Sequence, residues 1–117
     1  MTSIVAPPPI ADTPSPPQVQ RDAANRLHLS LTGELDIATV FDAFGEVIEA
    51  QPAPGEVVML DMSEVTFIDS SGLSMLLRVR NFLDVAGAQL TIANPSAAVT
   101  RSLMLIGLTE YFSIEAA

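Results

Sequence analysis

The chain of 117 residues has no cysteine and no lysine, and its single histidine is His28. The absence of cysteine excludes disulfides, thiolate zinc sites and thiol catalysis. Five arginines stand against 14 acidic residues, so the net charge is −9 at pH 7. This balance argues against binding to nucleic acids or anionic membranes, because both require basic side chains that neutralise phosphates. A protein partner with a basic contact surface is the natural electrostatic complement.

Long apolar runs are also missing, since no segment approaches the roughly 20 apolar residues of a membrane span. Residues 1–17 contain six of the nine prolines and one charged residue, Asp12. They lack the basic start and apolar stretch of a signal peptide, so we expect a cytoplasmic protein. Because proline disfavours regular hydrogen-bonded structure, these residues are predicted to be a disordered leader. A ligand for a proline-binding partner is the alternative. Residues 18–117 then form one domain.

The first half of this domain alternates between strand and helix patterns. Leu27, Leu29 and Leu31 alternate with polar residues, which predicts a strand with one buried face. Residues 18–22 are expected to pair with this strand across a turn. Asp36 is expected to cap a helix over 37–50. The predicted apolar stripe of that helix consists of Val40, Phe41, Phe44, Val47 and Ile48.

The second half continues the alternation. The apolar run 57–60 predicts a central strand that is buried on both faces. A helix over 71–86 that ends at Gly87 is followed by a strand over 88–93. Asn94 and Pro95 predict the N-cap and first residue of a helix over 96–106, and 111–114 form a closing edge strand. The element order predicts an α/β fold with a mixed sheet of about four or five strands, parallel in its middle.

The most informative segment is Asp69-Ser70-Ser71-Gly72-Leu73, which joins an apolar strand end to the helix over 71–86. Two hydroxyl groups therefore lie where the first backbone N–H groups of a helix point outward without partners. A hydroxyl at this position can cap the helix, or it can carry a phosphate at the positive end of the helix dipole. The residues alone leave both interpretations open.

Residues suited to catalysis do not converge in the sequence. His28 lies in the middle of a predicted strand, away from the two serines. Asp36, Asp61 and Asp69 follow predicted strand ends, where active sites of open α/β sheets gather. An aspartyl-phosphate site normally also needs a lysine, and a turn with one glycine is not a phosphate-binding loop. We therefore expect no enzymatic activity, no metal site and no cofactor.

Three motifs in this order resemble the STAS domain, and more narrowly the bacterial anti-sigma factor antagonists: Gly33-Glu34-Leu35-Asp36, Asp69-Ser70-Ser71-Gly72-Leu73 and Asn94-Pro95. The resemblance covers residues 18–114 and implies a small mixed sheet with helices packed mainly on one face. It also implies that Ser70 is phosphorylated by a partner that is both a serine kinase and an anti-sigma factor. The unphosphorylated form would bind this partner and release a sigma factor, and a serine phosphatase would reset the cycle.

The residues that we expect to bind the partner are Asp36, Asp69, Ser71, Gly72, Leu73 and Leu77. The family places Asp36 near the phosphorylated turn. Leu73 and Leu77 lie one helical turn apart, on a flank outside the apolar arc of the predicted helix. They form either a contact patch or a surface that another helix covers. The chain is expected to be a monomer or weak dimer. An accessory subunit of a transporter or stress-signalling complex, without a phosphorylation switch, is the alternative function.

Overall fold

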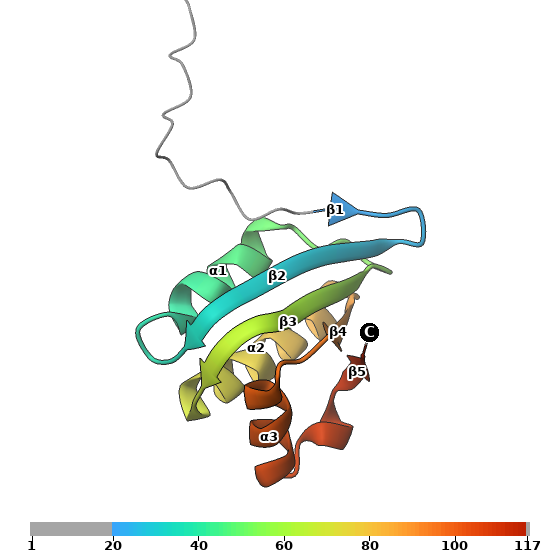
Figure 1. Cartoon of the computed structure of the whole chain (residues 1–117). Helices are drawn as coiled ribbons and strands as arrows, with labels where there is room; N and C mark the ends of the chain where they lie inside the picture. Colours follow the sequence, from blue (N-terminus) through green and yellow to red (C-terminus); the bar gives the residue numbers. More distant parts are fainter. Residues whose placement is uncertain (1–19, 117) are drawn as a thin grey trace, which may run out of the picture.

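The computed structural model describes residues 20–116, which form a five-stranded sheet in the order β1-β2-β3-β4-β5 (Figure 1). The short β1 (Gln20–Arg21) runs antiparallel to β2 (Arg26–Leu35). From β2 onward, β3 (Val57–Ile68), β4 (Gln89–Ala93) and β5 (Ser113–Glu115) are parallel. The predicted α/β class and mixed sheet are confirmed. The leader predicted over 1–17 lies outside the described residues.

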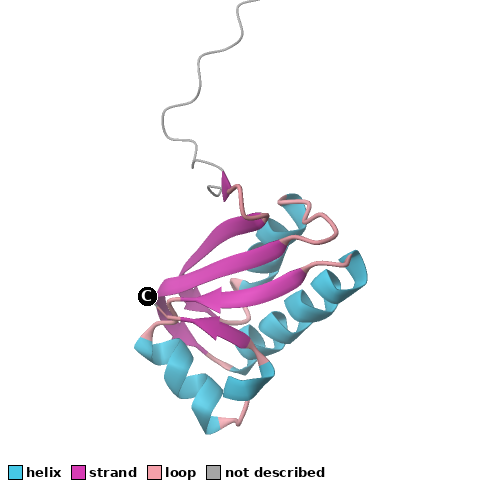
Figure 2. Cartoon of the chain, turned by 90° about the vertical axis from the view of Figure 1, so that its right-hand side faces the viewer, coloured by secondary structure: helices cyan, strands magenta, loops and turns pink. Residues whose placement is uncertain are grey.

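Helices α1 (Val40–Glu49) and α2 (Ser70–Ala86) connect successive parallel strands and lie behind β2 and β3 in Figure 1. They pack together through Phe44 and Phe82, whose rings meet edge to face with 6.0 Å between centroids. Helix α3 (Ala97–Leu105) lies at the lower end of the molecule in Figures 1 and 2. There the N–H of Ser96 donates to the carbonyl of Met62, beyond the end of β4. A short 3₁₀ helix (Thr109–Tyr111) precedes β5.

The core lies between the sheet and these helices, because alternate strand residues are large and apolar. Leu27, Leu29 and Leu31 are buried as the period-two pattern predicts. The central strand is buried on both faces at its start, where Val58, Met59 and Leu60 are at most 5% exposed. No helix within residues 20–116 is both long enough and apolar enough to cross a membrane.

Helix α1 begins at Val40, three residues later than predicted, because Asp36 stabilises a turn instead of capping the helix. The Asp36 carboxylate accepts a hydrogen bond from the N–H of Ala38 at 3.0 Å. The Thr39 hydroxyl accepts from the N–H of Asp36 at 3.0 Å and donates to the carbonyl of Glu34 at 2.6 Å. These local hydrogen bonds compete with helical ones and hold residues 36–39 in a turn.

The apolar stripe predicted for α1 is only partly correct. Val47 is buried, and Val40 and Phe44 pack partly buried against the core. Phe41 and Ile48, however, are 86% and 43% exposed. The predicted stripe is wider than the face that one helix buries against a sheet, so its two outer members remain in solvent.

Strand β3 extends to Ile68 and so includes Asp61, which the sequence analysis had placed after the end of the strand. Asp61 lies within β3, and its carboxylate accepts hydrogen bonds from the Ser63 hydroxyl at 2.7 Å and from the Asn94 amide at 3.1 Å. Partial burial raises the pKa of Asp61, but the hydrogen bonds from Ser63 and Asn94 together keep it below its usual value. Asp61 therefore has a structural role between two strands.

The start of α3 also differs from the prediction. Asn94 has a positive φ of 48° and lies outside the helix. Ser96 is the N-cap, and its hydroxyl accepts a hydrogen bond from the N–H of Val99 at 3.2 Å. The side-chain N–H of Asn94 donates to Asp61, which holds this side chain toward β3, and Ser96 caps the helix instead.

Candidate functional site

The first turn of α2 is fixed by Asp69, the residue directly after β3. One carboxylate oxygen of Asp69 accepts hydrogen bonds from the N–H groups of Ser71 at 2.9 Å and Gly72 at 3.2 Å. Asp69 is therefore the N-cap, and α2 begins at Ser70, one residue earlier than predicted. The two serines therefore do not cap the helix, which was one of the two interpretations of their hydroxyl groups.

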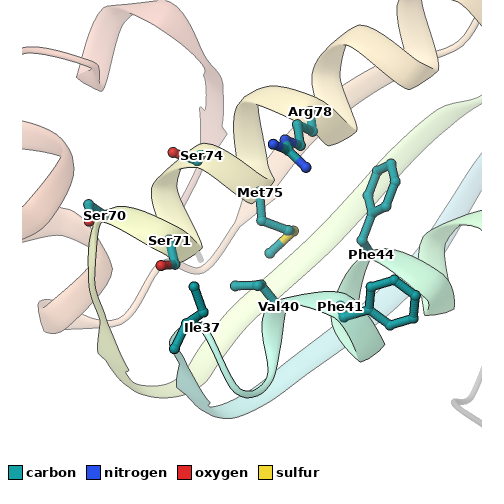
Figure 3. Close-up of a pocket in the computed structure, with 9 residues that line it drawn as sticks. All are labelled: Ile37, Val40, Phe41, Phe44, Ser70, Ser71, Ser74, Met75 and Arg78. Carbon is teal, nitrogen blue, oxygen red and sulfur yellow. The ribbon is translucent and has the colours of Figure 1, made fainter.

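Ser70 is the first helical residue, and its side chain is exposed. Ser71 is half-buried and lines a groove between α1 and α2 (Figure 3). In the part of the chain that the structure describes, neither hydroxyl has a hydrogen-bond partner. Ser70 therefore offers an accessible hydroxyl group at a helix N-terminus that the fold itself does not use.

Gly72 allows the start of α2 to lie very close to the ends of β2 and β3. A Cβ atom at this position would lie 2.7 Å from the carbonyl oxygen of Leu35 and 2.6 Å from a side-chain carbon of Ile68. Both distances are too short for a real contact, so only glycine fits without movement. The N–H of Asp69 also donates to the carbonyl of Leu35 at 3.2 Å. Gly72 is buried and acts by holding Ser70 in place.

Asp36 follows β2 where Asp69 follows β3, and the preceding residues Leu35 and Ile68 are paired in register. The two aspartates therefore follow neighbouring strand ends. No arginine within residues 20–116 forms an ion pair with either carboxylate. The surroundings of the Ser70 hydroxyl are acidic.

A groove with a cavity of about 310 Å³ extends from Ser70 along the space between α1 and α2 (Figure 3). Its walls are mostly apolar, and one end carries the guanidinium of Arg78. The lining residues are Ile37, Val40, Phe41, Phe44, Ser70, Ser71, Ser74, Met75 and Arg78. A mainly apolar concave surface with a few polar groups is typical of a binding site.

Of these nine lining residues, sequence reasoning named only Ser70 and Ser71 as site residues; the seven that it missed include Ile37, Phe41 and Arg78. Ile37 is 82% exposed because it lies in the turn before α1 and not in the helix. Phe41 was counted among the core residues. The sequence did contain a signal for Phe41. The apolar stripe predicted for α1 is wider than the face that a helix can bury against a sheet, so part of it must stay exposed.

The contact patch considered for Leu73 and Leu77 is not an exposed surface. Leu73 is 8% exposed and belongs to the core, and Leu77 is half-buried against it. Arg80, on the same helix, lies over the ring of Tyr111 at 4.3 Å from its centroid. Leu73 is therefore part of the core and does not form a free contact surface.

Several of the remaining polar residues, among them Asp22, His28 and Asp61, line a second and more polar pocket. His28 lies in the first half of β2, where its ring nitrogen is 2.8 Å from the carboxylate of Asp22. Among the described residues, no group of three or more histidine, aspartate or glutamate side chains is arranged to hold a metal ion. The turn at Ser70 and the adjoining groove are therefore the main candidate site.

Comparison with known proteins places this geometry in a family. The family described as "Mlab, STAS domain" matches residues 19–114. No curated protein matches the chain by sequence. An anti-sigma factor antagonist from Mycobacterium paratuberculosis is similar in structure, with 25% identity, a TM-score of 0.65, and 85% of this chain and 83% of that chain covered.

Two further structures share the fold. A Thermotoga maritima protein assigned as an anti-sigma factor antagonist has 19% identity and a TM-score of 0.73, with 86% of each chain covered. The anti-sigma factor antagonist SpoIIAA in its unphosphorylated form has 24% identity and a TM-score of 0.59, again with 86% of each chain covered. Since the family match spans nearly all of the described residues, the chain belongs to the STAS domain family.

Proposed function

We propose that this protein is an anti-sigma factor antagonist that is switched by phosphorylation of Ser70. Its unphosphorylated form binds an anti-sigma factor that is also a serine kinase, and this binding releases a sigma factor. Phosphorylation of Ser70 ends the interaction, and a serine phosphatase restores it. The observation that carries the proposal is the exposed, unbonded hydroxyl of Ser70 at the start of α2, beside a mainly apolar groove.

The physical basis of the switch is exclusion of the partner and not a change of fold. A phosphate on Ser70 would add nearly two negative charges at pH 7. The helix dipole stabilises such a charge, whereas Asp69 and Asp36 repel it. Arg78 lies eight residues further along α2, about 12 Å in helical rise, and within residues 20–116 no arginine forms an ion pair with the acids beside Ser70. The phosphate would therefore remain at the surface, where a docked partner must desolvate it.

The magnitude of this effect follows from the cost of burying an unpaired charge in an interface. That cost is about 2–5 kcal/mol. It corresponds to binding that is roughly 30-fold to several-thousand-fold weaker. Asp69, Ser71 and Asp36 contribute to the same contact surface in this proposal, while Gly72 and Leu73 act from beneath it.

The test is phosphorylation of the full chain by an anti-sigma kinase with ATP, followed by location of the phosphate by mass spectrometry. We expect one phosphate per chain, on Ser70, and none in Ser70→Ala. Ser71→Ala is the matched control, because Ser71 is the adjacent hydroxyl but is half-buried; it should still be phosphorylated. Phosphate on Ser71 in the unaltered chain, or none on either serine, would contradict the proposal.

A second candidate is an accessory subunit of a larger assembly without a phosphorylation switch. It is favoured by the description of the matching family, which names Mlab and not the anti-sigma factor antagonists. In this case the groove beside Ser70 would contact another subunit permanently. A stable complex that survives incubation with kinase and ATP, with Ser70 unmodified, would support the accessory role over the switch.

A further inference from the structure

The outward side of α1 carries a glycine that the fold does not explain. Gly45 lies in the interior of the helix, and its φ is not positive. Outside the backbone of its own helix, a Cβ atom added there would meet no heavy atom of residues 20–116 within 4 Å. Glycine in the interior of a helix destabilises it by roughly 0.5–1 kcal/mol relative to alanine. Neither backbone conformation nor internal packing therefore requires the glycine.

Gly45 stands in a row with two exposed apolar residues. Phe41, Gly45 and Ile48 have the spacing i, i+4, i+7, which places them along one side of a helix. Phe41 is 86% exposed and Ile48 is 43% exposed. Figure 3 shows Phe44 turned toward α2, where it meets Phe82, whereas no aromatic contact engages Phe41 among the described residues. Phe41 and Ile48 therefore form an exposed apolar face, and Gly45 between them leaves a space without a side chain.

A second row, displaced by one residue, is entirely acidic. Asp42, Glu46 and Glu49 have the same spacing, and no arginine in residues 20–116 forms an ion pair with any of them. Partial burial and the charges of Asp42 and Glu49 raise the pKa of Glu46. Glu46 and Glu49 also lie in the last turn of α1, which contains no basic residue and where the helix dipole disfavours negative charge. Glu46 and Glu49 therefore do not stabilise the isolated helix, whereas Asp42 lies in its first turn, where the dipole favours an acid.

From these two rows we infer that the outward side of α1 is a docking surface for a basic amphipathic helix of a partner protein. The apolar side of the partner helix would lie on Phe41 and Ile48, and its basic residues would face Asp42, Glu46 and Glu49. The backbones would approach closely at Gly45, where a side chain is missing. This inference goes beyond the proposed function, because it needs neither Ser70 nor a phosphate; the two surfaces share Phe41, which also lines the groove beside Ser70.

The experiment uses a defined probe. An 18-residue helical peptide with leucine along one side, arginine along the other and alanine at the crossing point is titrated into the ¹⁵N-labelled full chain. The amide signals of residues 41–49 should shift in a saturable and salt-sensitive manner. The same peptide with glutamate in place of arginine should not bind. Binding of both peptides, or shifts centred on another part of the chain, would overturn the inference.

Three variants separate docking from a structural role. Phe41→Ser and Gly45→Gln should each weaken binding of the arginine peptide about tenfold or more. Gly45→Gln should not lower the stability of the fold, because glutamine favours helix more than glycine does. Val85→Ser is the control, since Val85 is an equally exposed apolar residue on α2, at 91%. Unchanged affinity in Phe41→Ser and Gly45→Gln, or an equal loss in Val85→Ser, would overturn the proposal.

Discussion

Asp69 and Ser70 are adjacent residues with different tasks at the start of α2. The Asp69 carboxylate satisfies two backbone N–H groups, so the helix does not need the serine hydroxyl as a cap. This division of tasks allows Ser70 to be modified without loss of the helix start. Gly72 adds the close approach to Leu35 that holds the turn in position.

The division of tasks predicts different effects on stability at the two positions. Asp69→Ala should lower the free energy of unfolding by about 1 kcal/mol, because two N–H groups lose their partner. Ser70→Ala is the matched control and should change it by less than about 0.5 kcal/mol, as is usual for an exposed side chain without partners. Urea unfolding followed by circular dichroism measures both values. A larger loss in Ser70→Ala than in Asp69→Ala would show that the serine is the cap.

At the scale of secondary-structure elements, α1 combines a buried side with an outward side that is not optimised for stability. The buried side is formed by Ala43, Val47 and Ala50, each at most 6% exposed. The outward side carries Gly45 and the acidic row. Gly45 and the acids in the last turn of α1 make its exposed side less stable than it could be, which is consistent with selection for contact with a partner.

Gly45→Ala should therefore stabilise the isolated protein, by roughly 0.5–1 kcal/mol in the free energy of unfolding. Gly72→Ala provides the contrast, because its Cβ would collide with the backbone of β2, and it should destabilise the protein. Thermal unfolding of the two variants beside the unaltered chain measures the difference. If Gly45→Ala lowered the melting temperature, the helix would need the glycine for a reason that its surroundings do not show.

The sequence predicted most elements, because their signals are local. The alternation of Leu27, Leu29 and Leu31 and the left-handed cap at Gly87 (φ 77°) are examples that the structure confirms. The turn at Ser70 was predicted correctly in kind, but the cap is Asp69 and not one of the two serines that were considered for it. Serine and aspartate are similar as N-caps, so the choice between them depends on the direction in which the chain leaves β3.

Other features depended on particular side-chain hydrogen bonds and on packing between elements. The start of α1 was misplaced because the Thr39 hydroxyl bonds back to Glu34 and Asp36. The cap of α3 was misplaced because Asn94 bonds to Asp61, 33 residues away. The groove beside Ser70 requires two helices to pack side by side. Such arrangements cannot be obtained from the periodicity of a single segment.

At the scale of the whole molecule, ion pairs and hydrogen bonds of charged side chains connect the short β1 strand to the rest of the fold. Arg21 binds the buried carboxylate of Glu56 at 2.8 Å and also donates to the carbonyl of Ala50 at the end of α1. Asp22 accepts hydrogen bonds from Arg26 at 3.0 Å and contacts His28 at 2.8 Å. These contacts connect the N-terminal edge of the sheet to β2, β3 and α1.

The same contacts predict a loss of stability in acid. The hydrogen bond from His28, with those from the backbone of Arg26 and Ala24, lowers the pKa of Asp22 from 3.8 to about 2. The bond from Arg21 likewise lowers the pKa of Glu56. The folded state therefore binds fewer protons than the unfolded state in this range, so the stabilisation is complete above about pH 4 and is lost as pH falls toward 2.

Urea unfolding at a series of pH values measures this dependence. Asp22→Asn should show a weaker fall in stability between pH 4 and 2 than the unaltered chain. Asp84→Asn is the control, because Asp84 is exposed on α2, and it should retain the full dependence. Identical pH profiles for Asp22→Asn and the unaltered chain would show that the contacts around Asp22 do not stabilise the fold.

The most direct test of the proposed switch compares the affinity of an anti-sigma kinase for the chain before and after stoichiometric phosphorylation of Ser70, by isothermal titration calorimetry. The proposal predicts binding at least about 30-fold weaker after phosphorylation, with a melting temperature of the chain that does not change. Equal affinity of the two forms would contradict it, and weaker binding accompanied by unfolding would show that the phosphate acts on the fold instead of the interface.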